Sequence, residues 1–166
     1  MGTPTYTALA NITLGSSASS VTFSSIPATF RDLVLICVTA NGGSGANNGI
    51  RFNSDTGSNY TRLFMGVNGV GAFSSGNTTS TGFQYDNFAF STPNLGRNNH
   101  ILNIMDYSAT DKHKTILARA NREGDTLDAL TGRWANTSAV TTLNVYVIGG
   151  GDFLTGSSFA LYGIAS

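Results

Sequence analysis

The sequence predicts an all-β protein, namely a two-sheet antiparallel β-sandwich that is jelly-roll-like in its winding. Short segments rich in Val, Ile, Leu, Phe and Tyr recur at roughly 10-residue spacing, and Gly, Asn, Asp or Ser bound each of them. No segment sustains an apolar repeat of about 3.6 residues between helix caps. The 166 residues suffice for one core, whereas two separate domains would each be marginal. We therefore expect residues 1–166 to form a single β-sandwich domain.

The first half of the chain alternates between short strands and turns. Its expected strands lie at residues 6–14, 21–23, 33–39, 50–53, 60–67 and 83–90. Residues 33–39 form an uninterrupted apolar run, which predicts a central strand covered on both faces. Pro27 favours extended backbone at Ile26, just before that strand. Residues 42–48 and 68–79 contain so much Gly, Asn and Ser that we expect exposed loops there.

The second half repeats the pattern more regularly. Its expected strands lie at residues 100–107, 112–121, 127–134, 140–148 and 159–164. Residues 110–121 come nearest to a helical pattern, because Ile116, Leu117 and Ala120 would share one face of a helix. A short helix therefore remains an alternative at that point.

Composition excludes several classes of partner. Charged residues make up 11% of the chain, against about 25% in a typical globular protein, and the formal net charge is zero. The nine basic residues form no cluster that would bind a phosphate backbone, so we expect no nucleic-acid partner. No apolar run approaches the roughly 18 to 20 residues of a membrane span, so we expect no membrane insertion. The N-terminus lacks a secretory pattern, and we expect synthesis in the cytoplasm.

No catalytic motif is evident, and we expect neither an enzyme nor a bound cofactor. The acids are eight Asp and the single Glu123, and a glycosidase would need two carboxylates only a few ångströms apart. Most of the Asp residues adjoin small polar residues typical of turns, as do Asp55, Asp111, Asp125 and Asp152. Nucleophile-elbow and phosphate-loop patterns are also missing from the sequence.

Metal ligation is not indicated either. The segment from Asn53 to Asn59 resembles the first half of a calcium loop around Asp55, but no Glu stands at the twelfth position. His100 and His113 lie thirteen residues apart without a third ligand, and we expect two partly exposed side chains. Cys37 lies in an apolar run, which favours a buried structural thiol.

Four aromatic side chains with a polar group are the candidates for contact with a partner or a glycan: Tyr60, Tyr85, Tyr107 and Trp134. Such rings bury a large area while keeping one hydrogen bond. The alternative for each is a place in the core or in an interface between subunits.

Several stretches of the chain resemble small β-sandwich virion proteins of tailed bacteriophages, notably phages of aquatic bacteria. The stretches are Tyr-Thr-Ala-Leu-Ala at residues 6–10, Phe-Ser-Ser-Ile-Pro-Ala-Thr-Phe-Arg-Asp-Leu-Val-Leu at 23–35, Ile-Arg-Phe-Asn-Ser-Asp-Thr-Gly-Ser-Asn-Tyr at 50–60 and Gly-Ser-Ser-Phe-Ala-Leu-Tyr-Gly-Ile at 156–164. The resemblance implies a jelly-roll-like domain in a virion, as a homotrimer, and it supplies no functional residues.

Two functions follow from this resemblance. The first is a capsid decoration or cement protein that binds the major capsid protein on the outer head surface. The alternative is a receptor-binding tail-fibre or knob module that recognises a host-surface glycan. In either, the loops expected at residues 42–48 and 68–79 would carry the contacts. A free lectin or an enzyme on the same fold would be a third and a fourth class.

Overall fold

The computed structural model describes residues 5–43, 47–84, 97–122 and 126–165. All regular elements in these ranges are strands, so the predicted all-β class is confirmed. The strands are β1 (Tyr6–Thr13), β2 (Ser20–Phe23), β3 (Asp32–Thr39), β4 (Asn41–Gly42), β5 (Asn47–Phe52), β6 (Tyr60–Asn68), β7 (Gly71–Ser80), β8 (Phe83–Gln84), β9 (Asn98–Met105), β10 (Lys114–Arg122), β11 (Thr126–Trp134), β12 (Leu143–Ile148), β13 (Asp152–Phe153) and β14 (Ser158–Ile164).

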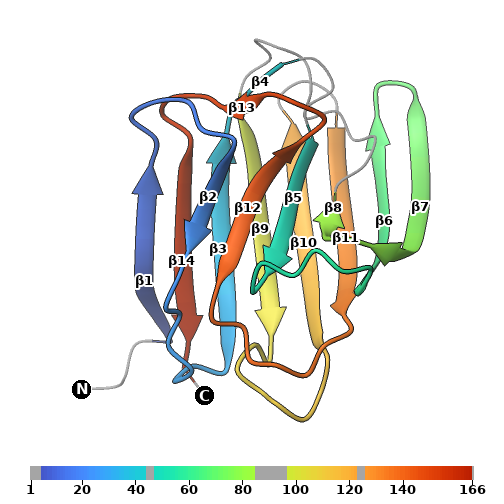
Figure 1. Cartoon of the computed structure of the whole chain (residues 1–166). Coiled ribbons are helices and arrows are strands. Elements are labelled where there is room, and N and C mark those ends of the chain that lie inside the picture. Colours follow the sequence, from blue (N-terminus) through green and yellow to red (C-terminus); the bar gives the residue numbers. More distant parts are fainter. Residues whose placement is uncertain (1–4, 44–46, 85–96, 123–125, 166) are drawn as a thin grey trace.

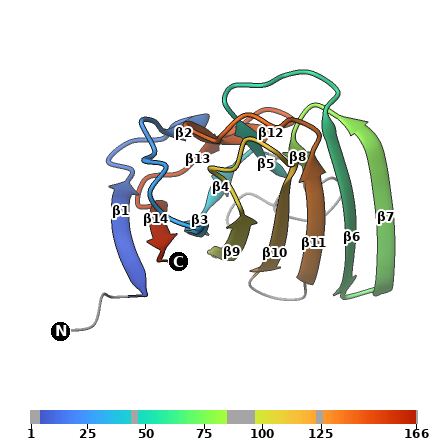
Figure 2. The same cartoon turned by 90° about the horizontal axis from the view of Figure 1, so that it is seen from below.

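Two antiparallel sheets pack face to face as a β-sandwich (Figures 1 and 2). The larger sheet has eight strands in the order β1-β14-β3-β9-β10-β11-β6-β7, and the smaller has four in the order β2-β12-β5-β8. The strands β13 and β4 add a two-stranded ladder at one end. Because the smaller sheet ends at β8, the β6–β7 hairpin stands at the margin of the sandwich (Figure 2).

Alternating burial explains why the strands of the large sheet form. Along β10, the residues from Lys114 onward alternate between buried and exposed up to Asn121, and β11 repeats the pattern from Thr126 to Trp134. This period of two fits a strand with one face on a core. The alternative of a short helix at residues 110–121 is therefore wrong, since the strand period outweighs the few apolar residues at helical spacing.

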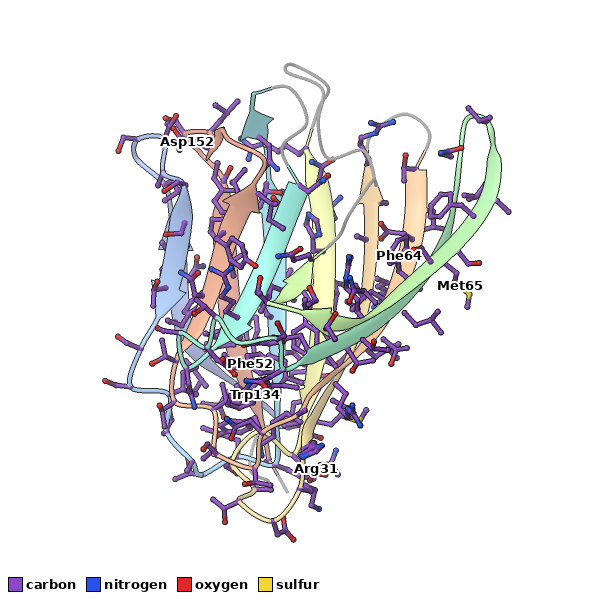
Figure 3. All side chains as sticks on the ribbon, turned by 45° about the vertical axis from the view of Figure 1, so that its right-hand side comes forward. Arg31, Phe52, Phe64, Met65, Trp134 and Asp152 are labelled. Atoms are coloured by element: carbon purple, nitrogen blue, oxygen red, sulfur yellow. The ribbon has the colours of Figure 1, made fainter. Side chains whose placement is uncertain are left out.

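Aromatic rings fill the core where the two sheets meet. The ring of Phe52 lies 5.6 Å from that of Trp134 and 5.3 Å from that of Phe83, centroid to centroid, both at steep angles. Tyr60 packs against the same two partners. Figure 3 shows Phe52 and Trp134 together between the sheets. Edge-to-face contacts of this kind add to the stabilisation from area burial alone.

Some expected loops are strands. Most of residues 68–79, predicted as a loop, form β7, which pairs with β6 along its length. Residues 42, 47 and 48 of the loop expected from 42 to 48 belong to β4 and β5. Asp152, predicted in a turn, lies in β13. Of the strand expected at 83–90, the first two residues form β8, and residues 85–90 lie outside the described ranges. At the expected loops and at Asp152, backbone pairing with a neighbouring strand orders residues whose side chains have little strand propensity of their own.

Over the described ranges, no helix is long and apolar enough to cross a membrane.

Candidate interaction surface

The outward side of β6 is unusually apolar. Arg62 and Phe64 face the interior and are buried, whereas the alternate residues Leu63, Met65 and Val67 are exposed. In Figure 3, Met65 extends away from the body of the protein. The solvent face of a half-buried strand is normally polar, so the outward side of this strand departs from the usual pattern.

Neighbouring strands extend this apolar area. Val67 lies opposite Leu127 on β11, and Leu117 on β10 lies opposite Thr131, which itself lies opposite Leu63. Directly paired residues share one face of a sheet. We name as the outer band the five side chains that are 45% to 58% exposed on this face: Leu63, Met65, Val67, Leu117 and Leu127.

The outer band is hollowed on either side of one arginine. A shallow depression of about 310 Å³ is lined by Met65, Val67, Leu127 and Arg119, among others. A smaller one of about 110 Å³ lies between Ile101, Arg119 and Leu127. Exposed arginine beside apolar side chains matches a partner that offers both apolar area and carboxylate or carbonyl oxygens. Several exposed apolar side chains on one sheet face are typical of surfaces that contact another molecule.

Three of the four aromatic candidates lie in the core instead. Tyr60, Tyr107 and Trp134 are at most 1% exposed, so none can stack on a glycan or touch a partner. The structure thus places them in the core, which was the alternative. Their polar groups find partners within the chain, which is the physical reason that burial is possible. Tyr85, the fourth candidate, lies outside the described residues.

The hydrogen bonds of these rings fix two turns. The Trp134 indole N–H donates to Asp55 Oδ2 at 2.7 Å, and the Tyr60 hydroxyl accepts from the backbone N–H of Phe52 at 3.1 Å. The Tyr107 hydroxyl donates to the carbonyl of Pro27. These bonds attach surface turns to the core.

The loop that resembles half a calcium site is held by donors of the chain itself. Asp55 Oδ1 accepts from the Gly57 N–H at 2.8 Å, and Oδ2 accepts from the Asn59 amide at 2.9 Å as well as from Trp134. Burial alone would raise the pKa of the Asp55 carboxyl, but these three hydrogen bonds together lower it below its usual value. The carboxylate therefore stabilises a turn, as predicted for Asp55.

A buried polar cluster lies between the sheets around His100. Asn41 donates from its amide nitrogen to Asn48 Oδ1 at 2.7 Å, and the amide nitrogen of Asn48 lies 3.3 Å from His100 Nε2. Thr39 Oγ1 is 3.4 Å from the same nitrogen. Because an amide nitrogen only donates, Nε2 accepts and the neutral ring carries its proton on Nδ1.

This burial bears on the expected metal ligands. Burial lowers the pKa of His100 to about 4 and raises that of the Cys37 thiol. His100 is thus buried, contrary to the expectation of partial exposure, because its polar neighbours satisfy the ring, while His113 is exposed. Within the described ranges, no three His, Cys, Asp or Glu side chains come together in a way that would hold a metal ion.

Sequence reasoning missed the outer band. Its signal lies in residues 62–67, where apolar residues occupy outward as well as inward positions of a strand at the margin of the sandwich. The sequence does not show which face of this strand lies on the core. The exposed positions can be recognised only when β6 is placed beside β11 in the sheet.

Comparisons with known proteins give no family for this chain. No protein-family model matches it, and no curated protein matches it. Two solved structures of alginate lyase Aly36B, one of them a double mutant in complex with an alginate tetrasaccharide, each align at 11% identity with a TM-score of 0.29. The alignments cover 93% and 91% of this chain and 80% and 78% of theirs. At such a TM-score, the similarity transfers no activity to this chain.

Proposed function

We propose that this chain is a structural protein of a bacteriophage virion, and specifically a capsid decoration protein that binds the outer surface of the head. The observation that carries the proposal is the outer band, a solvent-facing apolar surface on a protein of zero net charge. Exposed apolar side chains gathered on one face are a liability for a free monomer and are typical of a surface that docks on another protein.

The resemblance to phage virion proteins directs the proposal to a virion. In this proposal, the protein is made in the host cytoplasm and joins the head as a homo-oligomer, a homotrimer by the resemblance. Each copy would lay the outer band of β6, β10 and β11 on the major capsid protein, with Arg119 facing acceptor oxygens of the partner. Many copies on one head make weak individual contacts sufficient.

The alternative proposal is a receptor-binding module that recognises a host glycan. It would need a binding platform other than Tyr60, Tyr107 and Trp134, which the core occupies. The outer band does not resemble such a platform, because its five members are aliphatic or Met and offer no ring for a sugar to stack on.

The test is binding of the purified protein to phage heads from which it has been stripped. We expect saturable binding at a fixed number of copies per capsomer. The variant Met65→Lys places a charge in the centre of the contact and should weaken binding by about tenfold to one-hundredfold, the range of a central interface residue. Val70→Lys is the matched control, because Val70 is 98% exposed but lies at the hairpin tip, outside the outer band.

The outcomes separate the two proposals. Head binding that Met65→Lys weakens and Val70→Lys leaves intact supports decoration. Binding to host cells but not to heads, abolished by competing glycan, would overturn decoration and support the receptor-binding alternative. Head binding that Met65→Lys does not weaken would support a decoration role but show that the outer band is not the surface that contacts the head.

A further inference from the structure

Among the described strands of the large sheet, β7 is the last and lies at the edge. β7 pairs with β6 from Gly71 to Asn77 in regular register, and no described strand pairs with its other side. In the part of the chain that the structure describes, no strand neighbours that side of β7, and a strand can pair along both of its edges. The smaller sheet does not reach this edge (Figure 2).

β7 carries neither charges nor proline, two of the devices that block edge pairing, and its one irregularity lies near its end. Its ten residues contain no Lys, Arg, Asp, Glu or Pro, and eight of the ten are exposed. The register shift lies at its end, after Asn77, so most of the strand is regular. At the opposite edge of the sheet, β1 is interrupted by a bulge in its middle, between Ala8 and Ala10. Natural edges that stay single carry charges, prolines or bulges.

We propose that β7 is an assembly edge, which pairs antiparallel with β7 of a second copy of this chain. A twofold contact closes at two copies, so this pairing makes a dimer in place of the homotrimer that the resemblance implies. A twofold axis perpendicular to the sheet brings two identical strands side by side in opposite directions, which is the antiparallel arrangement. Such pairing is mediated by the backbone, so it requires only that the side chains do not repel one another.

The side chains of β7 favour a second copy over an unrelated partner. In a twofold contact each residue near the axis meets its own counterpart, so any charge there would face a like charge. The chain has nine basic and nine acidic residues, yet none lies on β7. An edge that binds a different protein would be free to use charges of one sign for steering. An uncharged edge of Gly, Ser, Asn and Thr suits self-pairing.

If the proposed function holds, the twofold pair also affects how the protein docks on the capsid. An axis perpendicular to the sheet leaves both copies with the same face outward, so their two outer bands become coplanar. The two β6 strands would then be three strand spacings apart, roughly 14 Å. A dimer would present both outer bands to the capsid on one side, with the uncharged β7 pair between them, and two linked contacts bind more tightly than one.

Sedimentation of the full chain over a range of concentrations tests the assembly edge. We expect a dimer in the wild type, and we expect Ser75→Lys to raise the dimer dissociation constant by about tenfold or more, because two lysines would meet across the axis. Ser75 is exposed and lies opposite the inward-facing Phe64, so the substitution leaves the outer band unchanged. Asn11→Lys is the matched control, an exposed residue on the opposite edge strand β1, and it should remain dimeric.

Hydrogen exchange supplies a second readout. In the dimer, alternate amides of β7 that exchange freely in dilute solution should become protected as the concentration rises, while the amides of β1 stay unchanged. A wild type that is monomeric throughout, or an oligomer that Ser75→Lys leaves intact, would overturn the assembly edge. An oligomer that is lost in Met65→Lys but kept in Ser75→Lys would show that copies stack through the outer band instead.

Failure of this inference is distinguishable from failure of the proposed function. A monomeric wild type that still binds stripped heads overturns the assembly edge and leaves decoration in place. A dimer that dissociates in Ser75→Lys but never binds heads keeps the edge and overturns decoration.

Discussion

Two buried titratable groups on the inner face of the large sheet should make the stability of this protein nearly independent of pH over a defined window. His100 on β9 and Asp128 on β11 both pair with Ala120 of β10, so they lie one on each side of it. Burial lowers the pKa of His100 to about 4 from 6.5 and raises the pKa of Asp128 to about 7 from 3.8. Both side chains are uncharged between these values.

The signs of the two contributions are opposite. The unfolded chain protonates His100 below pH 6.5 and the folded chain only below about 4, so this contribution to stability is present above 6.5 and is lost as the pH falls through that window. The folded chain keeps the proton of Asp128 up to about pH 7, whereas the unfolded chain releases it above 3.8. That contribution is present below 3.8 and is lost as the pH rises. Each slope is about 1.4 kcal/mol per pH unit, and the two cancel where the windows overlap.

If either group is removed, the free energy of unfolding should change with pH as the remaining group dictates. Between about pH 4.5 and 6, one uncompensated proton amounts to about 2 kcal/mol. The free energy of unfolding of Asp128→Asn should therefore rise by about that amount as the pH increases, whereas that of His100→Gln should fall by about the same amount. The wild type should change little. Asp55 does not interfere, because its pKa lies below its usual value and so below this window.

Urea denaturation at several pH values, followed by the fluorescence of Trp134, measures these slopes. Trp134 is the only tryptophan and is buried, so its emission reports on global unfolding. The double variant is the control and should again be nearly flat. Two results would refute the assignment of His100 and Asp128 as the compensating pair. In the first, the free energy of unfolding of both single variants depends on pH as that of the wild type does. In the second, the wild type itself changes by about 1.4 kcal/mol per pH unit.

Two further substitutions test the turns that the core holds. Trp134→Phe keeps most of the ring but removes the donor to Asp55. We expect it to cost about 2 to 3 kcal/mol in urea denaturation followed by circular dichroism, with the larger loss above pH 5 where the carboxylate is charged. A loss that did not change with pH would argue against that hydrogen bond. Gly163→Ala would place a Cβ 2.4 Å from the Phe30 ring, and it should lower stability by about 1 to 3 kcal/mol, whereas Gly15→Ala, with open space around it, should change it by less than about 0.5 kcal/mol. Equal effects of the two alanines would contradict the close packing of Phe30 on β14.

The sequence predicted the central strands well, because their burial leaves a clear period in the residues. β10 and β11 alternate almost without exception, and β3 is an apolar run. The edge strand β7 was missed because an edge strand needs only one partner and can be built of Gly, Ser, Asn and Thr. Its order comes from backbone pairing with β6, a tertiary effect that local propensity does not show.

The candidate site was less predictable than the fold. Large amphipathic rings are good candidates for binding when they are exposed, yet Tyr60, Tyr107 and Trp134 found hydrogen-bond partners inside the chain. The outer band instead consists of ordinary aliphatic residues and Met65, which look like core residues in the sequence. What distinguishes them is the absence of a covering sheet on their side, and that depends on how many strands pack on each face.

The stretches that resemble phage virion proteins fall mainly on the frame of the sandwich. Residues 23–35 include Phe30, which packs on Gly163, and residues 50–60 include Asn53, which has a positive φ of 51° and whose side chain binds the backbone of Thr141 and Thr142. Residues 156–164 supply the strand beside β3. A resemblance in such segments speaks for the architecture, because turns and paired strands constrain their residues wherever the fold occurs.

The surfaces proposed to bind lie outside those stretches. Four members of the outer band come from β6 and β11, the fifth comes from β10, and the assembly edge is β7, so none of these residues falls within 23–35, 50–60 or 156–164. Two proteins that share the frame can therefore differ completely in what they dock on. Binding of stripped heads by the wild type, Met65→Lys and Ser75→Lys addresses the proposed function directly, because these substitutions change the surface and lie outside the stretches that resemble phage virion proteins.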